Sequence, residues 1–515
     1  MTNRADKLFL AFVLFFSPAI LSLGCAKGEV KEGYKLENIR LDKSSLTMRV
    51  GDKEQVIAYP VPSVARQPAF QWSSSDESVA TVVNGLVEAV AVGEAIISVQ
   101  HEQVRVDLPV TVLEKYVSGN GNDTIFQIVL GWQECAFANR AEYGVYLPKG
   151  TDPLQGVLIL QHGCTMEQFG ITRPYDLQYQ ALAKKWKLAI LETALHGDCH
   201  IWREPDSGSG AAISKVLEQI ASVSGRPELK DAPWLLWGHS GGGFWVLAML
   251  RDHPEQILAA VSYSAAWDPQ WEYSANAAKV PLLLRHAGAN DGSPDILCWQ
   301  TAVNTFHKLR KMDAPVIVAH NDGQNHNFSY LRYMAIPFFE AALKKRLPLD
   351  GSHTLRDIDR DDTWLGDTLS LEVYREQGYT GDKSNLCLFP DELTARNWQE
   401  FVSTGTVVDK TPPPAPRDVK VTRYADRLEV TWEADADIES GILKFNIYKD
   451  GVLVGVLPES GAYQSFDTNG DNTIPVEVPE KRFIIRVTGN VKATISIETV
   501  NHFNLVSERT TVMAQ

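Results

Sequence analysis

The fold of this chain is indicated most strongly by residues 234–242, Trp234-Leu235-Leu236-Trp237-Gly238-His239-Ser240-Gly241-Gly242. An apolar run enters a G-x-S-x-G sequence, and a second apolar run, Phe244 to Leu250, leaves it. This pattern predicts a strand, a tight turn and a helix, with glycines that let strand and helix pass closely. The hydroxyl of Ser240 is then held out above the sheet. The backbone N–H of Gly241 lies near the helix N-terminus, where it can stabilise developing negative charge.

Candidate partners for Ser240 follow it along the chain, after two further predicted strands. Val280–Arg285 is an apolar run bounded by proline, which predicts a buried parallel strand, and it leads into a glycine-rich turn that contains Asp291. Pro315–Ala319 is predicted to be the last strand, and His326 lies in the polar loop after it. Because the carboxyl ends of parallel strands meet at one edge of a sheet, we expect these side chains to lie together.

These features resemble the α/β-hydrolase superfamily over about residues 140–348. The segments Gln161-His162-Gly163, the serine turn and Gly288 to Asp291 are most similar to secreted bacterial esterases of the feruloyl esterase, acetylxylan esterase and polyhydroxybutyrate depolymerase type. The resemblance implies a doubly wound, mostly parallel α/β sheet, with Ser240 as nucleophile, His326 as general base and Asp291 as its orienting acid. It also implies an oxyanion hole formed by the backbone N–H groups of Gly241 and Cys164, and no metal or cofactor.

Each assignment has a rival in the sequence. Asp268 follows the strand-like run Ala259–Tyr263 and competes with Asp291, as does Asp295. Asp291 is preferred because its glycine-rich turn is similar to the family's. His320 competes with His326, but it follows the last strand so closely that it is expected to be a loop histidine.

Substrate contacts are expected from the loop Thr193–Gly210, because loops after such strands border the pocket in open α/β sheets. Trp202 in this loop either stacks on a sugar or aromatic acyl group or pins the loop. His239, beside the nucleophile, is the second predicted substrate contact.

The N-terminus has the pattern of an export signal. Arg4 and Lys7 precede an apolar run, Leu8 to Leu23, that is too short for a membrane span, and Cys25 follows Gly24. This resembles a bacterial lipobox and implies lipid attachment at Cys25, although Ser22 departs from the usual aliphatic residue. The expected location is the bacterial cell envelope, at the outer membrane or cell surface, or secretion if the lipobox is not used.

Charge and cysteines restrict the partners. The formal net charge of −15 argues against nucleic acid and anionic membrane surfaces. Apart from Cys25, five cysteines are scattered without C-x-x-C spacing, which argues against metal binding. Disulfides are permitted in an exported protein, but the pairing cannot be deduced from the sequence.

The chain is predicted to be multidomain, with the central α/β-hydrolase domain, residues 115–348, flanked by N- and C-terminal all-β sandwich domains. Residues 36–114 resemble the bacterial Ig-like domain, group 2, in motifs such as Trp72 to Val82. Residues 349–410 are an accessory segment expected to pack on the hydrolase, and 411–416 a proline-rich linker. Residues 417–515 resemble a fibronectin type III domain through Leu428–Trp432 and Phe445–Gly451. Both outer domains are expected to be spacers that contribute little to turnover.

The predicted function is hydrolysis of carboxylic esters through an acyl-enzyme, with acyl groups on an extracellular polysaccharide as the expected substrate. A serine peptidase of the prolyl oligopeptidase type is one alternative. A catalytically inactive surface binding or adhesion protein is another.

Overall fold

The computed structural model describes residues 35–50, 53–63, 69–113, 124–131, 135–151, 153–267, 269–292, 298–321, 323–348, 354–465, 469, 476, 478–489 and 492–514. The chain forms two compact units, Met1–Glu114 and Lys115–Gln515. Within the described ranges, no helix is both long enough and apolar enough to cross a membrane. The predicted export signal and Cys25 lie outside the described residues, as do the rival acids Asp268 and Asp295.

The first unit is an all-β sandwich, as predicted. One sheet has the strand order β2-β9-β8-β5, a second has β3-β7-β6, and β1 pairs with β4. Side chains such as Ile97 and Val110 fill the core between the sheets, and the half-buried Trp72 packs against them. The strands are β1 Asn38–Leu41, β2 Leu46–Arg49, β3 Lys53–Gln55, β4 Ala58–Val61, β5 Gln71–Ser74, β6 Ala80–Val83, β7 Leu86–Ala89, β8 Gly93–His101 and β9 Val104–Leu113.

The second unit is built on an eight-stranded sheet of order β10-β11-β13-β12-β14-β15-β16-β17. Strand β11 runs antiparallel to its neighbours β10 and β13, and all other neighbouring pairs are parallel, which confirms the predicted doubly wound, mostly parallel α/β sheet. The edge strand β10 lies before residues 140–348, the range over which the sequence resembles the superfamily. The strands are β10 Thr124–Gly131, β11 Arg140–Leu147, β12 Gly156–Gln161, β13 Leu188–His196, β14 Trp234–His239, β15 Ile257–Tyr263, β16 Leu282–His286 and β17 Val316–His320.

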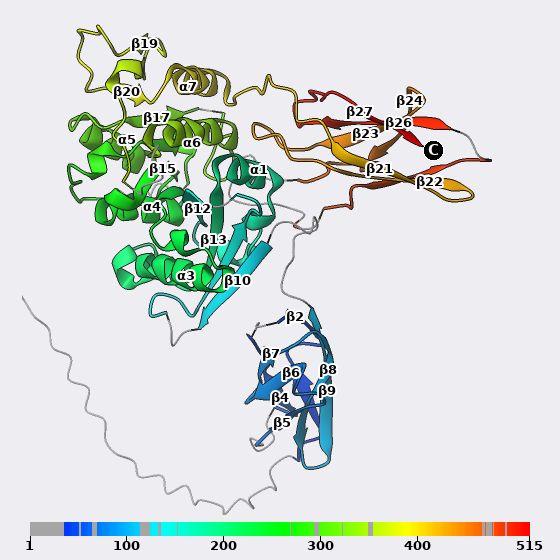
Figure 1. Ribbon diagram of the computed structural model, residues 1–515. Coiled ribbons are helices and arrows are strands. Elements are labelled where there is room, and N and C mark those ends of the chain that lie inside the picture. Colours follow the sequence, from blue (N-terminus) through cyan, green and yellow to red (C-terminus); the bar gives the residue numbers. More distant parts are fainter. Residues whose placement is uncertain are drawn as a thin grey trace, which may run out of the picture. The chain divides into compact units, whose positions relative to one another are not determined.

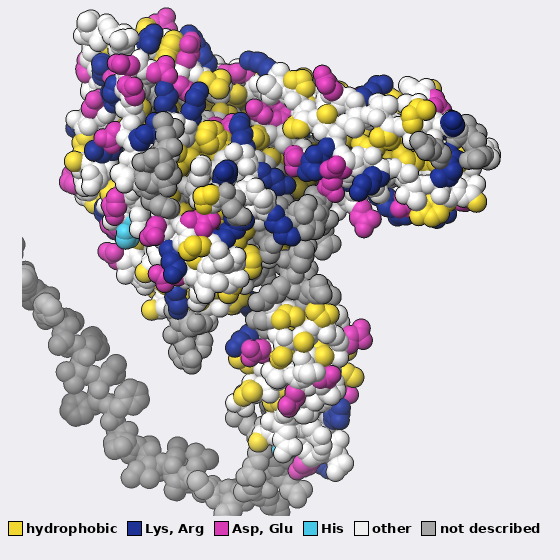
Figure 2. Space-filling view, in the orientation of Figure 1, with side chains coloured by type: hydrophobic (Ala, Val, Ile, Leu, Met, Phe, Trp, Pro, Cys, Tyr) yellow, Lys and Arg dark blue, Asp and Glu magenta, His cyan; other side chains and the backbone are white. Residues whose placement is uncertain are grey.

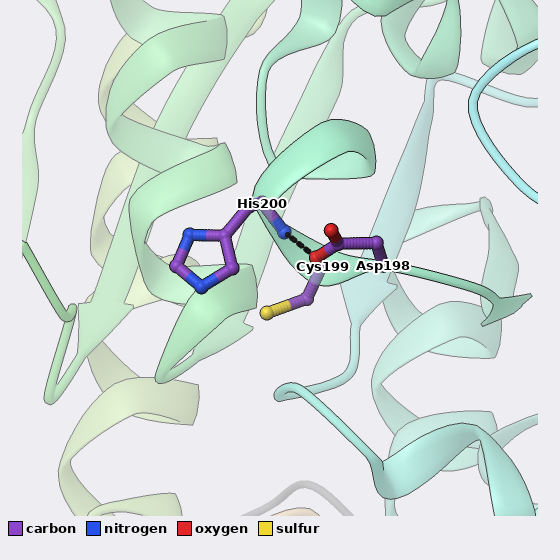
Figure 3. Close-up of side chains that lie close together, drawn as sticks. All are labelled: Asp198, Cys199 and His200. Carbon is purple, nitrogen blue, oxygen red and sulfur yellow. Dashed lines mark hydrogen bonds between the residues drawn. The ribbon is translucent and has the colours of Figure 1, made fainter. Parts of the chain in front are cut away.

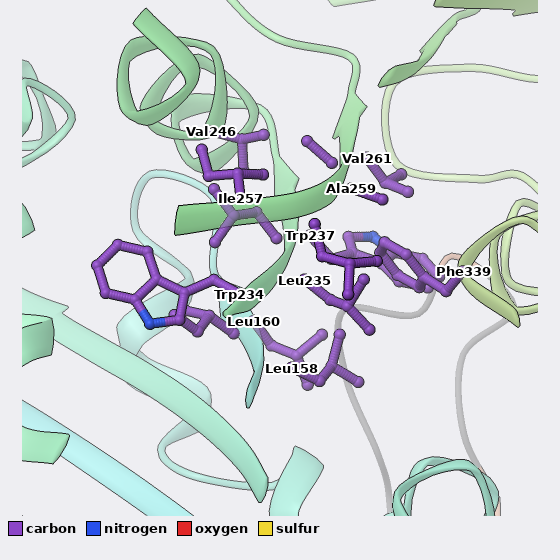
Figure 4. Packing of buried hydrophobic residues seen from close by; sticks show 14 of the residues in the cluster. Leu158, Leu160, Trp234, Leu235, Trp237, Val246, Ile257, Ala259, Val261 and Phe339 are labelled. Carbon is purple, nitrogen blue, oxygen red and sulfur yellow. The ribbon is translucent and has the colours of Figure 1, made fainter. Parts of the chain in front are cut away.

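Helices pack on this sheet (Figure 1). Strand β14 is buried on both faces, which explains its unbroken apolar sequence. Figure 4 shows Trp237 directed at Phe339 on one side of the strand and Val246 on the other. The helices of the unit are α1 Leu177–Trp186, α2 Cys199–Trp202, α3 Ser209–Ser224, α4 Gly241–Asp252, α5 Cys298–Arg310, α6 Arg332–Arg346 and α7 Glu392–Thr404.

The accessory segment packs on the sheet edge at β17 (Figure 1). It contains α7 and a small sheet of order β19-β18-β20. The indole of Trp398 is buried and donates a hydrogen bond to the Val318 carbonyl at 2.8 Å. The small sheet comprises β18 Trp364–Asp367, β19 Val373–Arg375 and β20 Leu386–Phe389.

The C-terminal domain is a second all-β sandwich, with sheets β21-β22-β25 and β24-β23-β26-β27. Trp432 lies in its core, edge-on to Phe445. Acidic and basic side chains are interspersed over the visible face of residues 115–515 (Figure 2). The strands are β21 Arg417–Arg423, β22 Arg427–Glu433, β23 Lys444–Lys449, β24 Val452–Leu457, β25 Arg482–Arg486, β26 Ala493–Val500 and β27 Thr510–Ala514.

Candidate active site

Ser240 lies in the tight turn between β14 and α4. Its backbone has φ 54° and ψ −115°, in a region that non-glycine residues rarely adopt. The turn needs glycine on both sides: a Cβ on Gly238 would lie 2.1 Å from the Gly242 carbonyl oxygen, and one on Gly242 would lie 2.4 Å from the His162 carbonyl oxygen. The serine is therefore held in a strained conformation by close backbone packing, as the G-x-S-x-G pattern predicts.

The structure brings Ser240, His326 and Asp291 together in one hydrogen-bonded chain. His326 Nε2 lies 3.0 Å from Ser240 Oγ, and His326 Nδ1 lies 2.8 Å from Asp291 Oδ1. A neutral imidazole that donates from Nδ1 to the carboxylate leaves Nε2 free to accept the serine proton. The arrangement can therefore activate the serine hydroxyl as a nucleophile.

The Asp291 carboxylate is buried and fully engaged. Its Oδ2 accepts hydrogen bonds from Ser264 Oγ at 3.0 Å and from the Ala287 backbone N–H at 2.9 Å. Burial raises the pKa of this carboxyl, but the hydrogen bonds from His326 and Ala287 and the charge of Arg285 outweigh burial and hold the pKa below its usual value. Asp291 is therefore an anion at neutral pH and can stabilise a protonated His326.

Arg285, at the end of β16, is a support that sequence reasoning missed. Its guanidinium is fully buried. It donates to Ser264 Oγ at 2.8 Å, to the carbonyls of Asn325 and Phe328 at 3.0 and 3.3 Å, and to Gln324 Oε1 at 2.9 Å. The Arg285 cation thus holds both Ser264, which binds the Asp291 carboxylate, and the loop that contains His326, called the histidine loop below. The sequence feature that could have indicated Arg285 is a charged residue near the end of an otherwise apolar strand, because a buried charge needs partners.

The carbonyl of His326 is fixed by two further side chains. Tyr263 Oη donates to it at 2.7 Å and His239 Nε2 at 3.0 Å. His239 is buried and stacks on the Tyr263 ring, with centroids 4.4 Å apart. The predicted substrate contact by His239 is therefore corrected, because its imidazole is buried and holds the His326 carbonyl.

The loop after β12 reaches the nucleophile where an oxyanion hole is expected. A Cβ on Gly163 would lie 3.3 Å from Ser240 Cβ, and one on Gly241 would lie 3.5 Å from the Cys164 nitrogen. His162 is buried and accepts from the Leu195 N–H at 2.8 Å, and burial lowers its pKa to about 3. His162 is thus a neutral structural residue. The two backbone amides of Cys164 and Gly241 lie beside the serine, where they can bind an oxyanion.

A disulfide joins Cys164 to Cys199, 35 residues away at the start of α2. The disulfide joins the loop after β12, which contains Cys164 and is called the oxyanion loop below, to the loop after β13. The sequence left the pairing of the cysteines open. Figure 3 shows Cys199 beside Asp198 and His200, where the Asp198 carboxylate accepts from the His200 backbone N–H at 2.9 Å and caps α2. Because the Cys199 sulfur is already bonded, this cluster offers a metal only a carboxylate and an imidazole.

A second cluster of metal-binding residue types, Asp291, Cys298 and His326, shares two of its members with the hydrogen-bonded chain of Ser240, His326 and Asp291. The Cys298 sulfur lies 3.6 Å from His326 Nδ1, which is already engaged with Asp291. Burial raises the pKa of the Cys298 thiol, which disfavours the thiolate that a metal requires. Cysteine and histidine here are better explained by the hydrogen-bonded chain than by a metal centre.

Trp202 does not face a substrate. It is fully buried, packs edge-on to His162 with centroids 5.0 Å apart, and would lie 3.4 Å from a Cβ on Gly241. The prediction that it stacks on a sugar or acyl group is therefore corrected. Its large side chain supports the oxyanion loop and the first turn of α4 from beneath.

A cationic and aromatic cluster, which the sequence does not indicate, lies next to the turn that contains Ser240. The Arg203 guanidinium carbon lies 3.8 Å from the Trp267 ring centroid and 4.7 Å from that of Phe244. The His200 ring also contacts Trp267, with the two ring centroids 4.7 Å apart. The loops after β13 and β15 therefore meet beside the nucleophile through aromatic and cationic side chains.

His320, the rival of His326 in the sequence, stacks on His286, with the two ring centroids 4.7 Å apart.

Comparisons with known proteins give remote likenesses. The structure is similar to poly(aspartic acid) hydrolase-1 from Sphingomonas sp. KT-1, at 16% identity, covering 40% of this chain and 94% of that chain, with a TM-score of 0.29. An S-formylglutathione hydrolase from Staphylococcus aureus matches at 17% identity over 43% and 95% of the two chains, with a TM-score of 0.29. A ferulic acid esterase matches at 12% identity over 43% and 97%, with a TM-score of 0.30.

No curated relative matches the sequence. The match to a family model concerns the first unit. Residues 35–112 match the bacterial Ig-like domain (group 2), which confirms the family that the sequence motifs indicated for the N-terminal domain.

Proposed function

We propose that this chain is a serine hydrolase that cleaves carboxylic esters through an acyl-enzyme. The observation that carries the proposal is the hydrogen-bonded chain from Ser240 through His326 to Asp291, at 3.0 and 2.8 Å. His326 Nε2 takes the hydroxyl proton as Ser240 Oγ attacks the ester carbonyl carbon. The carbonyl oxygen becomes an oxyanion that the amides of Gly241 and Cys164 stabilise.

Collapse of this tetrahedral intermediate breaks the bond to the leaving oxygen. His326 returns its proton to the departing alcohol, and the acyl group stays on Ser240. Water then attacks the acyl carbon, with His326 again as base, and releases the acid. The buried anion of Asp291 holds the imidazole in one tautomer through both halves of the cycle.

Hydrolysis of a small activated ester tests the proposal. The full mature chain is expected to hydrolyse p-nitrophenyl acetate, and Ser240→Ala is expected to lose nearly all of this activity while keeping the same thermal unfolding midpoint. Comparable rates for the two proteins would show that Ser240 is not the nucleophile.

We further propose that the natural substrates are acyl esters on an extracellular polysaccharide and that a lipid at Cys25 anchors the enzyme in the cell envelope. The support is the Ig-like domain together with the lipobox-like sequence that ends at Cys25. A panel of acetylated and feruloylated polysaccharides, longer acyl esters and a peptide amide distinguishes this substrate class from a peptidase. Release of acid from the amide alone would contradict it.

A further inference from the structure

The C-terminal sandwich is joined to the hydrolase by buried polar contacts. Gln464 accepts from the Leu177 backbone N–H at 2.7 Å and donates to the Tyr175 carbonyl at 2.8 Å. From the hydrolase side, Gln178 donates to the carbonyls of Ile438 and Glu439 at 2.8 and 2.9 Å. These side-chain amides satisfy backbone groups across the junction, which fixes its register.

Asn469 makes a contact of the same kind at the catalytic histidine loop. Its side chain is 6% exposed. Its Oδ1 accepts from the Ser329 backbone N–H at 2.5 Å, and its Nδ2 donates to the Asn327 carbonyl. One side-chain amide from the C-terminal domain therefore pairs with a carbonyl and an N–H of the segment that follows His326 directly.

Residues of the hydrolase and of the accessory segment also hold this loop. Tyr263 and His239 hold the His326 carbonyl, and Arg285 holds the carbonyls of Asn325 and Phe328. Gln324 donates to the Gly405 carbonyl of the accessory segment at 2.7 Å. Asn469 adds a support from a third part of the chain, the C-terminal domain, and binds the residues on either side of Phe328.

We infer that Asn469 is a positioning residue for catalysis and that the C-terminal sandwich is thereby a component of the active centre. The inference rests on the proposed esterase function. A displacement of about 1 Å in a catalytic group can cost about a hundredfold in rate, so a support one residue away from His326 acts on the Ser240–His326 geometry. A spacer role, expected from the sequence, does not include such a contact.

The test compares two variants of the full mature chain at the same domain junction. Asn469→Ala removes the support of the histidine loop, whereas Gln464→Ala removes contacts to the start of α1 and serves as the matched control. With p-nitrophenyl acetate, Asn469→Ala is expected to lower kcat about tenfold with KM nearly unchanged. Gln464→Ala is expected to lower the unfolding midpoint with kcat within about twofold of wild type.

Combination with Tyr263→Phe separates positioning from general destabilisation. Because Tyr263 and Asn469 support the same loop, the losses of kcat from Tyr263→Phe and Asn469→Ala are expected to be non-additive, while Gln464→Ala and Tyr263→Phe combine additively. Equal kcat values for Asn469→Ala, Gln464→Ala and wild type would overturn the inference.

If Asn469→Ala does not fold, Asn469→Asp tests whether Asn469 positions the histidine loop. It keeps the shape and the acceptor for Ser329 but replaces the donor to Asn327, so the same fall in kcat is expected, and a wild-type kcat would overturn the inference. Failure of the proposed function has a different signature, because the wild-type chain itself would then hydrolyse no ester.

Discussion

Loss of the Cys164–Cys199 disulfide is expected to weaken both the stability of the larger unit and its catalysis. The bond closes a loop of 35 residues, and the chain-entropy relation gives about 4 kcal/mol of stabilisation for a loop of that length. The proposed mechanism also assigns an oxyanion amide to Cys164, and complete loss of one such donor costs about a hundred- to a thousandfold in kcat. Because Trp202 still supports the loop from beneath, Cys199→Ser is expected to lose only part of that, about tenfold.

Urea unfolding and ester hydrolysis, each with and without dithiothreitol, measure the two effects. Cys199→Ser should unfold at lower urea than wild type and turn over p-nitrophenyl acetate more slowly. Reductant should move the wild-type protein towards the variant and leave the variant unchanged, which provides the internal control. Coincident urea midpoints and equal kcat values without reductant would refute the assigned role of the cross-link.

Two further predictions concern buried charges. Arg285→Met leaves Ser264 and the carbonyls of Asn325 and Phe328 without their donor, and it removes the charge that lowers the pKa of Asp291. We expect kcat to fall more than a hundredfold and the free energy of unfolding, measured by urea titration, to fall by about 3 kcal/mol. A wild-type kcat would contradict this. Burial, with the nearby Glu439 and Asp409, raises the pKa of Asp437 to about 8 from an ordinary 3.8. The folded state therefore holds a proton that the unfolded state releases. This contribution to the stability of the folded state is lost as pH rises from about 4 to 8. Asp437→Asn should therefore gain stability relative to wild type between pH 5 and pH 8 in urea midpoints, and a constant difference would show that Asp437 does not titrate in that window.

The parts of the site that sequence predicts are those encoded by local pattern. The apolar run from Trp234 and the glycines around Ser240 specify a strand and a tight turn by themselves, and β14 and α4 follow. Asp291 and His326 were placed by the order of strands, because parallel strands deliver the residues after them to one edge of the sheet.

The supports of the site depend on contacts between distant segments, which no local pattern encodes. Asn469 meets Ser329 across 140 residues, and its own surroundings in the sequence carry no catalytic signal. The sequence predicts a substrate contact for His239 and leaves Trp202 between a substrate contact and a role in pinning its loop, and burial decides both. Packing against Tyr263 and His162 removes both from the surface.

Covalent labelling with a fluorophosphonate, followed by peptide mapping, shows whether Ser240 is the activated nucleophile. The reagent reports a serine activated by a neighbouring base, whatever the natural substrate. We predict a single adduct on the peptide that contains Ser240, its absence in Ser240→Ala, and strongly slowed labelling in His326→Ala and Asp291→Asn. An adduct on a different residue, or equal labelling of Ser240→Ala and wild type, would contradict the assignment of Ser240, His326 and Asp291 as the catalytic chain.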